Sequence, residues 1–401
     1  MKITHIKIRE IQGTLKYPGT FFEERRGQPT DIYPEFKSEP AAAVSGAIPA
    51  GKDRYKVIRN FVQIDTDQGV SGLAGPYSGR AISLYIETQL KPLLIGRDPL
   101  STEFLWDIMY RSAVMGRKGD HMTAISQIDI ALWDIKGKWL GQPVYKLLGG
   151  PMQDKIPAYA STSGYSLEPE KVAERVRKLR GQGNLGTKWF IRLGPTDGAE
   201  GIKKNVAIVA AAREAGGADM EIMLDAWNSW DVPYTLKIAE LVKDYGVSWI
   251  EEPVMPDFIE GYAKLRALSP IPIAGGEHEF TRYGAKMLLD TEAVDILQLD
   301  PTYAGGISEI VKVYNIASTY DVKVIIHGSL VPVNAHLSFA QNKALVPMME
   351  YLVVRNEATQ LFFKNPVKPV KGFFTPPEAP GVGLDLDEKK IESEREISFT
   401  K

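Results

Sequence analysis

Short apolar runs that end in an acidic residue or a histidine recur at a nearly constant spacing between residues 221 and 328. Their ends are 26, 26, 23 and 27 residues apart and fall at Asp225, Glu251, Glu277, Asp300 and His327. A strand, a turn, a helix and a second turn take about that length of chain, so the spacing predicts successive βα units. Strands that are apolar throughout are typical of a parallel sheet covered on both faces. We therefore expect the functional residues at the C-terminal strand ends, where barrel enzymes carry their chemistry.

The alternation of strand and helix patterns covers most of the chain beyond residue 155. It begins with a strand at 156–160, continues through Lys188–Leu193 and ends with a strand near 348–353. The first 140 residues follow a different pattern, with strands expected at 1–12 and 57–66 and helices at 79–95, 100–112 and 121–140. The tail that follows the last strand is rich in proline and lacks the barrel period, so we expect it to pack back on the N-terminal part.

Residues 13–56 form a long segment without strand or helix periodicity. Irregular segments of this length inside a compact chain are usually functional or disordered. Several aromatic residues argue against disorder here, and Arg25 and Arg26 lie among them: Tyr17, Phe21, Phe22, Tyr33 and Phe36. We interpret the segment as a lid over a site, with a contact between subunits as the alternative.

The composition excludes several classes of function. The chain has 401 residues, with 48 Lys and Arg against 50 Asp and Glu and a net charge of −2, which gives no sign of a nucleic acid or anionic membrane as partner. The absence of cysteine excludes thiol catalysis, disulfides and cysteine-zinc sites. The N-terminus lacks the apolar block of a signal peptide, and no run of about 18 apolar residues occurs, so we expect a cytoplasmic protein without a membrane span.

Asp225, Glu251 and Glu277 come from three consecutive predicted strands. Neighbouring strands lie about 4.8 Å apart, so the three carboxylates can converge on one point. Converging carboxylates repel one another unless a cation compensates their charge, and oxygen-only ligands suit a hard divalent ion such as Mg²⁺. Each acid taken alone is also explained as a helix N-cap or a surface residue. Their common position at successive strand ends favours a metal site.

Asp300 and His327 end the next two runs. A carboxylate beside an imidazole fixes its tautomer and raises its basicity, so the pair is a candidate general base. The alternative is a histidine with a structural role in the core.

These residues also carry a family resemblance. The runs resemble the enolase superfamily, in its mandelate racemase-like branch, at Leu224–Trp227, Trp249–Pro253, Gly276–His278, Gln298–Pro301 with Gly305–Gly306, and Ile326–Ser329. The segment Ile128–Asp134 with Pro143–Val144 and Leu147–Gly150 is similar to the family's domain junction. Sites of the enolase superfamily use Mg²⁺ to stabilise an enediolate.

The resemblance implies a modified (β/α)7β TIM barrel under an α+β capping domain that the C-terminal tail completes. We place the capping domain at residues 1–123 with its lid at 13–56, the barrel at 124–355 and the returning C-terminal segment at 356–401. It further implies Mg²⁺ on Asp225, Glu251 and Glu277, with the His327–Asp300 pair as base or acid.

Finer motifs resemble one activity within that branch. The Gly-Glu-His and His-Gly-Ser forms, and the spacing from Lys188 to Gly194-Pro195, resemble acid-sugar dehydratases such as rhamnonate dehydratase, and Thr30–Phe36 resembles members linked to lyxonate. We therefore expect a lyase that removes the proton α to the carboxylate of an aldonic acid and eliminates the 3-hydroxyl, giving a 2-keto-3-deoxy acid. The alternatives are a racemase or epimerase of a 2-hydroxy acid and a catalytically silent binding protein on the same fold. Relatives are commonly homo-oligomers.

The roles of the remaining polar residues are less determined. Arg192 stands where many relatives have lysine, and because it stays protonated it is a poor base, so we expect it to bind substrate or support the metal carboxylates. His278 is a candidate for binding substrate or acting as the acid, with a structural role as the alternative. Glu350 is a candidate for orienting the substrate, with a salt bridge at the barrel mouth as the alternative. Lys188 is either a substrate ligand or a salt-bridged barrel residue. From the lid we expect Tyr33 and Arg25 to bind substrate.

Overall fold

The computed structural model describes residues 1–41 and 45–399. Residues 42–44 of the predicted lid and 400–401 of the predicted C-terminal segment lie outside the described part. The N-terminal part of the chain forms an antiparallel sheet in which β1 (Ile3–Lys16) pairs with β3 (Arg54–Thr66), and β2 (Ile48–Pro49) and β4 (Ser71–Tyr77) also pair with β3. The predicted strands at 1–12 and 57–66 are confirmed.

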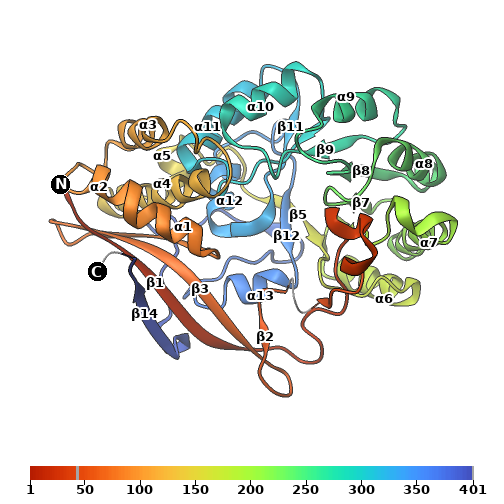
Figure 1. Ribbon diagram of the computed structural model, residues 1–401, viewed down its shortest axis with the longest axis horizontal. Coiled ribbons are helices and arrows are strands. Elements are labelled where there is room, and N and C mark those ends of the chain that lie inside the picture. The colour runs from red at the N-terminus through yellow and green to blue at the C-terminus, as the bar shows by residue number, and fades with distance from the viewer. Residues whose placement is uncertain (42–44, 400–401) are drawn as a thin grey trace.

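Helices cover one face of this sheet (Figure 1). The predicted helix at 79–95 consists of α1 (Arg80–Tyr85), a π-helical turn (Ile86–Leu90) and α2 (Lys91–Leu94), and it is followed by α3 (Thr102–Ser112) and α4 (Asp120–Trp139). Within α4, almost every side chain is buried because the helix packs on β4 on one side and on the barrel helix α11 on the other. The boundary predicted at residue 124 falls inside this continuous helix, so no linker separates the two parts there, and the domain limits stay a prediction.

The rest of the chain builds the barrel (Figure 1). Within the described residues, eight strands pair in parallel in the order β11-β10-β9-β8-β7-β6-β5-β12. They are β5 (Ile156–Ser161), β6 (Gly186–Phe190), β7 (Glu221–Asp225), β8 (Val247–Glu251), β9 (Ile273–Gly275), β10 (Ile296–Leu297), β11 (Lys323–Val324) and β12 (Met349–Leu352). The connecting helices are α6 (Pro169–Gly181), α7 (Gly198–Gly216), α8 (Val232–Val242), α9 (Ile259–Leu268), α10 (Thr281–Asp290), α11 (Gly306–Ala317) and α12 (Val331–Phe339). The predicted (β/α)7β barrel is confirmed.

Side chains of alternate strand residues fill the barrel interior. One buried layer contains Tyr159, Met223, Trp249, Ala274, Ile296 and Ile325. Successive residues of a strand point to opposite faces, so the second residue after Met223 or Trp249 points into the barrel again. Those residues are Asp225 and Glu251, which lie opposite each other in the register of β7 and β8. The strand period therefore places two of the predicted metal ligands just above the apolar layer.

The C-terminal segment returns to the N-terminal sheet, as predicted. Strand β14 (Ser393–Ile397) pairs antiparallel with β1 and forms the edge of that sheet. Asp134 of α4 ties the parts together, because its buried carboxylate accepts backbone hydrogen bonds from Leu73 (2.9 Å) and Val382 (2.8 Å). No helix in residues 1–41 and 45–399 is long and apolar enough to cross a membrane.

Candidate active site

Lys188 lies at the centre of a buried cluster of carboxylates inside the barrel. Its Nζ atom lies 3.1 Å from Oδ2 of Asp225 and 2.8 Å from Oε1 of Glu350, and it also contacts Oε1 of Glu251. The Lys188 side chain has 0% exposure, because β6 places it in the interior below the strand ends. The prediction that Lys188 binds substrate is wrong, since its ammonium is enclosed by three acids of the protein. Lys188 is instead a salt-bridged residue of the barrel interior, which was the alternative prediction.

The remaining oxygens of Asp225 and Glu251 are held by the protein as well. Oδ1 of Asp225 accepts the backbone N–H of Trp227 at 3.0 Å. Oε2 of Glu251 accepts hydrogen bonds from Nε1 of Trp249 (3.1 Å) and Nε2 of Gln298 (2.8 Å). These contacts fix both carboxylates in place at the strand ends.

Glu252 follows the last residue of β8 and pairs with His278. The distance between Oε2 of Glu252 and Nδ1 of His278 is 2.7 Å, and Nδ2 of Asn228 donates to the same oxygen at 3.0 Å. Ligand atoms of Glu252, Glu277 and His278 all lie within 4.8 Å of one another, and in the described residues no other trio of acids, histidines or cysteines does so. The oxygens of Asp225, Glu251 and Glu277 are thus more widely spread than the sequence led us to expect.

Charge balance nevertheless separates the predicted metal ligands from their neighbours. Burial raises the pKa of Asp225 and of Glu277, and it raises the pKa of Glu251 to about 8. At these three acids, burial and the charge of neighbouring acids together outweigh the nearby positive charges, including that of Lys188. Buried carboxylates of this kind are an oxygen donor set that fits a hard divalent cation.

The other two acids of the cluster are compensated. Burial raises the pKa of Glu252, but the charge and hydrogen bonds of His278 outweigh burial and lower it below its usual range. Lys188 has the same effect on the pKa of Glu350, whose Oε2 also accepts the backbone N–H of Gly328 at 2.7 Å. Neither Glu252 nor Glu350 therefore requires a cation.

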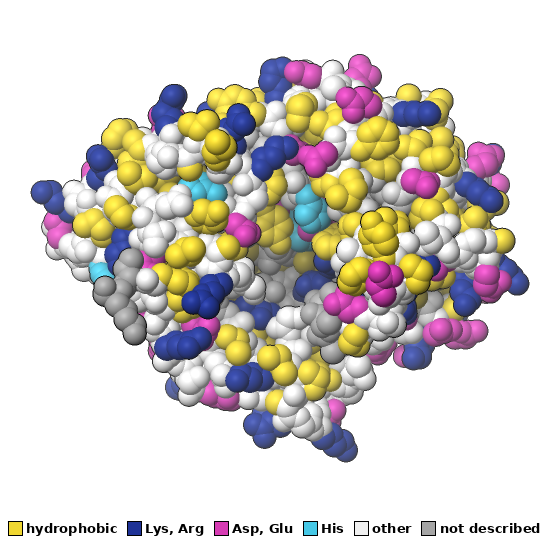
Figure 2. All heavy atoms as spheres, in the orientation of Figure 1, with side chains coloured by type: hydrophobic (Ala, Val, Ile, Leu, Met, Phe, Trp, Pro, Cys, Tyr) yellow, Lys and Arg dark blue, Asp and Glu magenta, His cyan; other side chains and the backbone are white. Residues whose placement is uncertain are grey.

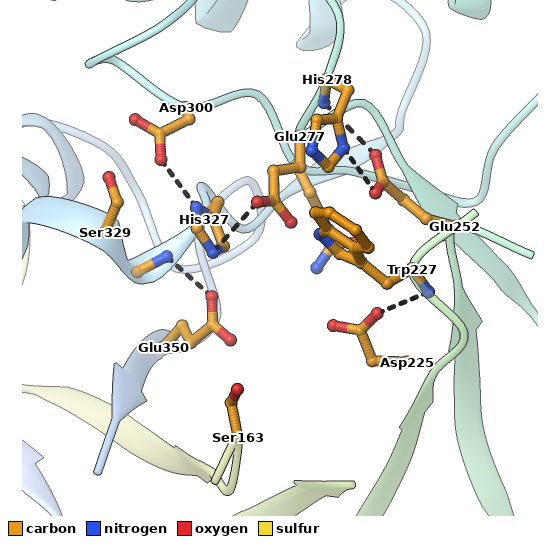
Figure 3. A network of polar contacts seen from close by, with 12 residues as sticks. Ser163, Asp225, Trp227, Glu252, Glu277, His278, Asp300, His327, Ser329 and Glu350 are labelled. Carbon is orange, nitrogen blue, oxygen red and sulfur yellow. Dashed lines mark hydrogen bonds and ion pairs between the residues drawn. The ribbon is translucent and has the colours of Figure 1, made fainter. Parts of the chain in front are cut away.

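His327 lies between two carboxylates beyond the end of β11 (Figure 3). Its Nδ1 atom is 2.7 Å from Oδ2 of Asp300, and its Nε2 atom is 3.4 Å from Oε1 of Glu277. Oδ1 of Asp300 accepts hydrogen bonds from the backbone N–H and the hydroxyl of Thr302, both at 2.6 Å. Burial lowers the pKa of His327, but Glu277 and Asp300 outweigh burial and raise it to about 10. The predicted pairing of His327 with Asp300 is present.

A cavity of about 470 Å³ opens between the barrel and the N-terminal part, and the space-filling view shows this face hollowed near its centre (Figure 2). Barrel residues lining it include Glu277, His278, Tyr303 and His327. His278 is partly exposed in the cavity and has a pKa of about 9, because Glu252 and Glu277 outweigh the lowering caused by burial. Glu350 lies behind His327, bound to Lys188, and does not line the cavity.

Three further predicted site residues lie away from this cavity. Arg25 is buried and makes two 2.8 Å hydrogen bonds to the carboxylate of Asp31, so it ties together two parts of segment 13–56. Tyr33 is 52% exposed and packs against Phe36. Arg192 follows the end of β6 and bonds Oε1 of Glu24 at 2.6 Å. The expected contacts of Arg25, Tyr33 and Arg192 with the substrate or the metal carboxylates are therefore replaced by contacts within segment 13–56 and between this segment and the barrel.

Sequence reasoning missed several residues that the cavity contains. Arg26 lines it in place of Arg25, with its guanidinium 3.5 Å from the ring centroid of Trp227. Arg59 and Arg355 line it from β3 and from α13 (Arg355–Thr359). No periodic pattern marks these positions, and only the adjacent pair of arginines in the lid hinted at one of them.

Comparison with known proteins decides the family. Residues 171–390 match the enolase C-terminal domain-like family, and residues 52–149 match the N-terminal domain of the mandelate racemase/muconate lactonizing enzyme family. The chain belongs to the enolase superfamily. The match covers both the barrel and the cap, as the predicted membership in the mandelate racemase-like branch requires.

Individual members of the enolase superfamily align over most of this chain. The L-rhamnonate dehydratase of Saccharopolyspora erythraea is 34% identical over 336 residues, which is 81% of this chain and 82% of that protein. The D-galactarolactone cycloisomerase of Agrobacterium fabrum is 33% identical over 341 residues, 82% of this chain and 88% of that protein. The crystal structure of rhamnonate dehydratase from Gibberella zeae complexed with Mg is similar with a TM-score of 0.82 and 30% identity, covering 97% of this chain and 96% of that chain.

Proposed function

We propose that this protein is a Mg²⁺-dependent acid-sugar dehydratase that converts an aldonic or related sugar acid into a 2-keto-3-deoxy acid. The observation that carries the proposal is the position of His327, held by Asp300 on one nitrogen and facing Glu277 at the cavity with the other. Relatives named as L-rhamnonate dehydratases support the substrate class.

We assign Asp225, Glu251 and Glu277 as the Mg²⁺ ligands, because these three acids carry the uncompensated charge. Bound there, the ion would supply electrostatic stabilisation for the negative charge that develops on the substrate carboxylate when the α-proton is removed. Glu252 keeps His278 in place beside this site, and Lys188 holds Glu251 and Glu350 from below.

His327 is assigned as the base. Burial lowers the pKa of the ring, but Glu277 and Asp300 raise it to about 10, so without a cation the ring is protonated at neutral pH. A cation held by Glu277 would offset the charge of that carboxylate and lower the pKa of the ring, so that neutral Nε2 could take the proton from the α-carbon while Asp300 stabilises the imidazolium that results. The protonated ring then stands at the cavity as an acid for the departing 3-hydroxyl, which leaves as water. His278 is the second candidate acid, since a pKa of about 9 keeps it protonated at neutral pH. The resulting enol rearranges to the 2-keto acid.

The test is a screen of aldonic and aldaric acids, with Mg²⁺ present, for 2-keto-3-deoxy product. Running positive reactions in D₂O separates the racemase alternative, because a deuterated, inverted acid without keto product would contradict a dehydratase. Calorimetry with Mg²⁺ tests the catalytically silent alternative, for which neither ion binding nor turnover is expected.

A cycloisomerase is the second candidate function, because a relative at 33% identity is named D-galactarolactone cycloisomerase. Elimination of a ring oxygen instead of a free hydroxyl requires the same proton abstraction at His327. Sugar-acid lactones therefore belong in the screen, and product of unchanged mass would favour this candidate. Location in the cytoplasm and assembly into a homo-oligomer stay predictions, the latter open to light scattering.

A further inference from the structure

Three arginines line the cavity that contains His327. Arg26 belongs to the lid, Arg59 to β3, and Arg355 begins α13 after the last barrel strand. The charges of Arg26 and of Arg59 both lower the pKa of Arg355, so the three guanidiniums are close enough to repel one another. Such a concentration of positive charge is unfavourable unless an anion neutralises it.

The acids of the cavity compensate this charge only in part, because burial lowers the pKa of all three arginines and Glu277 raises that of Arg26 and Arg355 but not that of Arg59. Glu277 and Asp120 are the acidic residues among the described lining residues. Within residues 1–41 and 45–399, no ion pair within 4.0 Å forms to Arg26 or Arg59. Arg59 instead donates to the backbone carbonyls of Gly46 (2.8 Å) and Ile58 (2.9 Å). These bonds fix the guanidinium without cancelling its charge.

The two ends of the cavity differ in character. Arg26 packs on Trp227, two residues after Asp225, and the nearby charges that raise its pKa include Glu277 and Asp225. It therefore lies at the carboxylate end, where a substrate carboxylate and the cation are expected. Arg59 has no acidic neighbour that shifts its pKa. Arg355, influenced by both, lies between the two.

Arg59 and Arg355 both remain charged at neutral pH. Burial lowers the pKa of Arg355 to about 9 and that of Arg59 to about 10, so each is still protonated at pH 7. Guanidinium groups bind carboxylates and phosphates through paired N–H donors, with greater strength where water is excluded. A sugar acid with a single carboxylate offers them only hydroxyl groups.

We infer that Arg59 and Arg355 form a second anion-binding site, so that the substrate is an acid sugar with anionic groups at both ends. The inference rests on the proposed function and narrows its substrate class. A six-carbon aldarate, or an aldonate phosphorylated at its far end, has this charge pattern. Loss of a charge-assisted hydrogen bond changes affinity by about 10-fold to 100-fold, which is large enough to decide between such substrates.

The experiment compares a six-carbon aldarate, the aldonate of matching configuration and its 6-phosphate, with wild-type protein and the variants Arg59→Gln and Arg355→Gln. We expect kcat/KM of wild type to favour a doubly charged acid over the aldonate by about tenfold or more. Each variant should lose this preference mainly through KM, with a much larger loss on the doubly charged acid than on the aldonate. Arg59→Lys should retain part of the preference for the doubly charged acid, because lysine keeps the positive charge. Arg54→Gln, an exposed arginine on the same strand, is the control and should behave as wild type.

Equal turnover of singly and doubly charged acids by wild type, or equal losses on both in the variants, would overturn the inference and leave the dehydratase proposal intact. If no acid sugar reacts, the proposed function fails instead. Calorimetry with adipate and hexanoate at saturating Mg²⁺ then decides the inference separately. Adipate binding that Arg59→Gln abolishes supports the second anion site, and equal or absent binding of both acids contradicts it. Thermal unfolding confirms that each variant is folded.

Discussion

Oδ2 of Asp300 lies 2.7 Å from Nδ1 of His327, and this contact determines which nitrogen of the ring faces the cavity. The carboxylate is itself held by two hydrogen bonds from Thr302, so the ring has little freedom to rotate. The proposed proton abstraction is thereby restricted to Nε2, the ring nitrogen that faces Glu277.

Replacement of His327 by Asn should lower kcat for any accepted sugar acid by about 10²-fold to 10⁴-fold, because the proposed base is removed. Exchange of the substrate α-proton with D₂O should be lost in parallel, as followed by NMR. Asp300→Asn should keep substrate binding but slow the exchange. His5→Asn, at an exposed position of β1, should have no effect. Unchanged turnover in His327→Asn would remove the base assignment.

Replacement of Asp225 by Asn or Glu277 by Gln should weaken Mg²⁺ binding by at least about tenfold in calorimetry, because each change removes a proposed ligand charge. Glu252→Gln should weaken it less, since His278 already compensates that acid. Glu221→Gln, at the other end of β7, provides the matched control. If Glu252→Gln has the largest effect, the ion is held by the closely spaced Glu252–Glu277–His278 group instead.

Replacement of Lys188 by Met should destabilise the metal-free protein by about 3–5 kcal/mol, because it leaves three buried carboxylates without their counter-charge. Added Mg²⁺ should raise the unfolding temperature of this variant more than that of wild type, since the ion replaces part of the missing positive charge. Lys286→Met, which breaks an exposed pair with Asp290, should change the unfolding temperature little. An equal rise in unfolding temperature on addition of Mg²⁺ in Lys188→Met and wild type would contradict the idea that Lys188 and the ion compensate the same carboxylates.

Acid should destabilise the fold through His336, a buried histidine of α12. Its Nδ1 accepts the backbone N–H of Tyr145 at 3.2 Å, and burial lowers the pKa of the ring to about 4 from an ordinary value of 6.5. The folded state therefore binds fewer protons than the unfolded state between these values, so the stabilisation is complete above about pH 6.5 and is lost as the pH falls through 4. The difference corresponds to about 3 kcal/mol.

Urea unfolding at pH 7 and pH 4.5 measures this effect. His336→Gln should be less stable than wild type at pH 7 and should show a smaller decrease between the two pH values. His5→Gln, which changes an exposed histidine, should keep the wild-type pH dependence. An undiminished decrease in His336→Gln would assign the acid sensitivity to other groups.

The barrel and the His327–Asp300 pair could be predicted from sequence because both follow from strand spacing. A parallel strand with its covering helix uses a nearly constant length of chain, so residues at equal spacing reach the same end of the sheet. Asp225 and Glu251 then share a face because each lies two residues beyond an inward-facing apolar side chain. These relationships are properties of regular structure, and the sequence carries them directly.

The lid and the barrel-mouth contacts could not be predicted in this way. Whether Arg25 or Arg26 faces the cavity depends on Asp31, which binds Arg25 and turns it away, and an irregular loop has no period that reveals such a pairing. Lys188 was ambiguous because one residue of register on β6 decides between the barrel interior and the outer face that the helices cover. Arg59 and Arg355 line the same cavity although they are almost 300 residues apart in the sequence, and no local sequence pattern predicts this.

The pairing of β14 with β1 has a consequence for the order in which the protein becomes complete. During synthesis, β1 emerges first and the strand that covers its edge emerges last, after every barrel strand. A nascent chain can therefore assemble the carboxylate cluster of the barrel while the N-terminal sheet still lacks its edge strand β14. We expect shortened chains that lack residues 393–397 to keep a folded barrel but to aggregate through the exposed edge of β1. Loss of the tail should therefore reduce solubility before it reduces enzymatic activity.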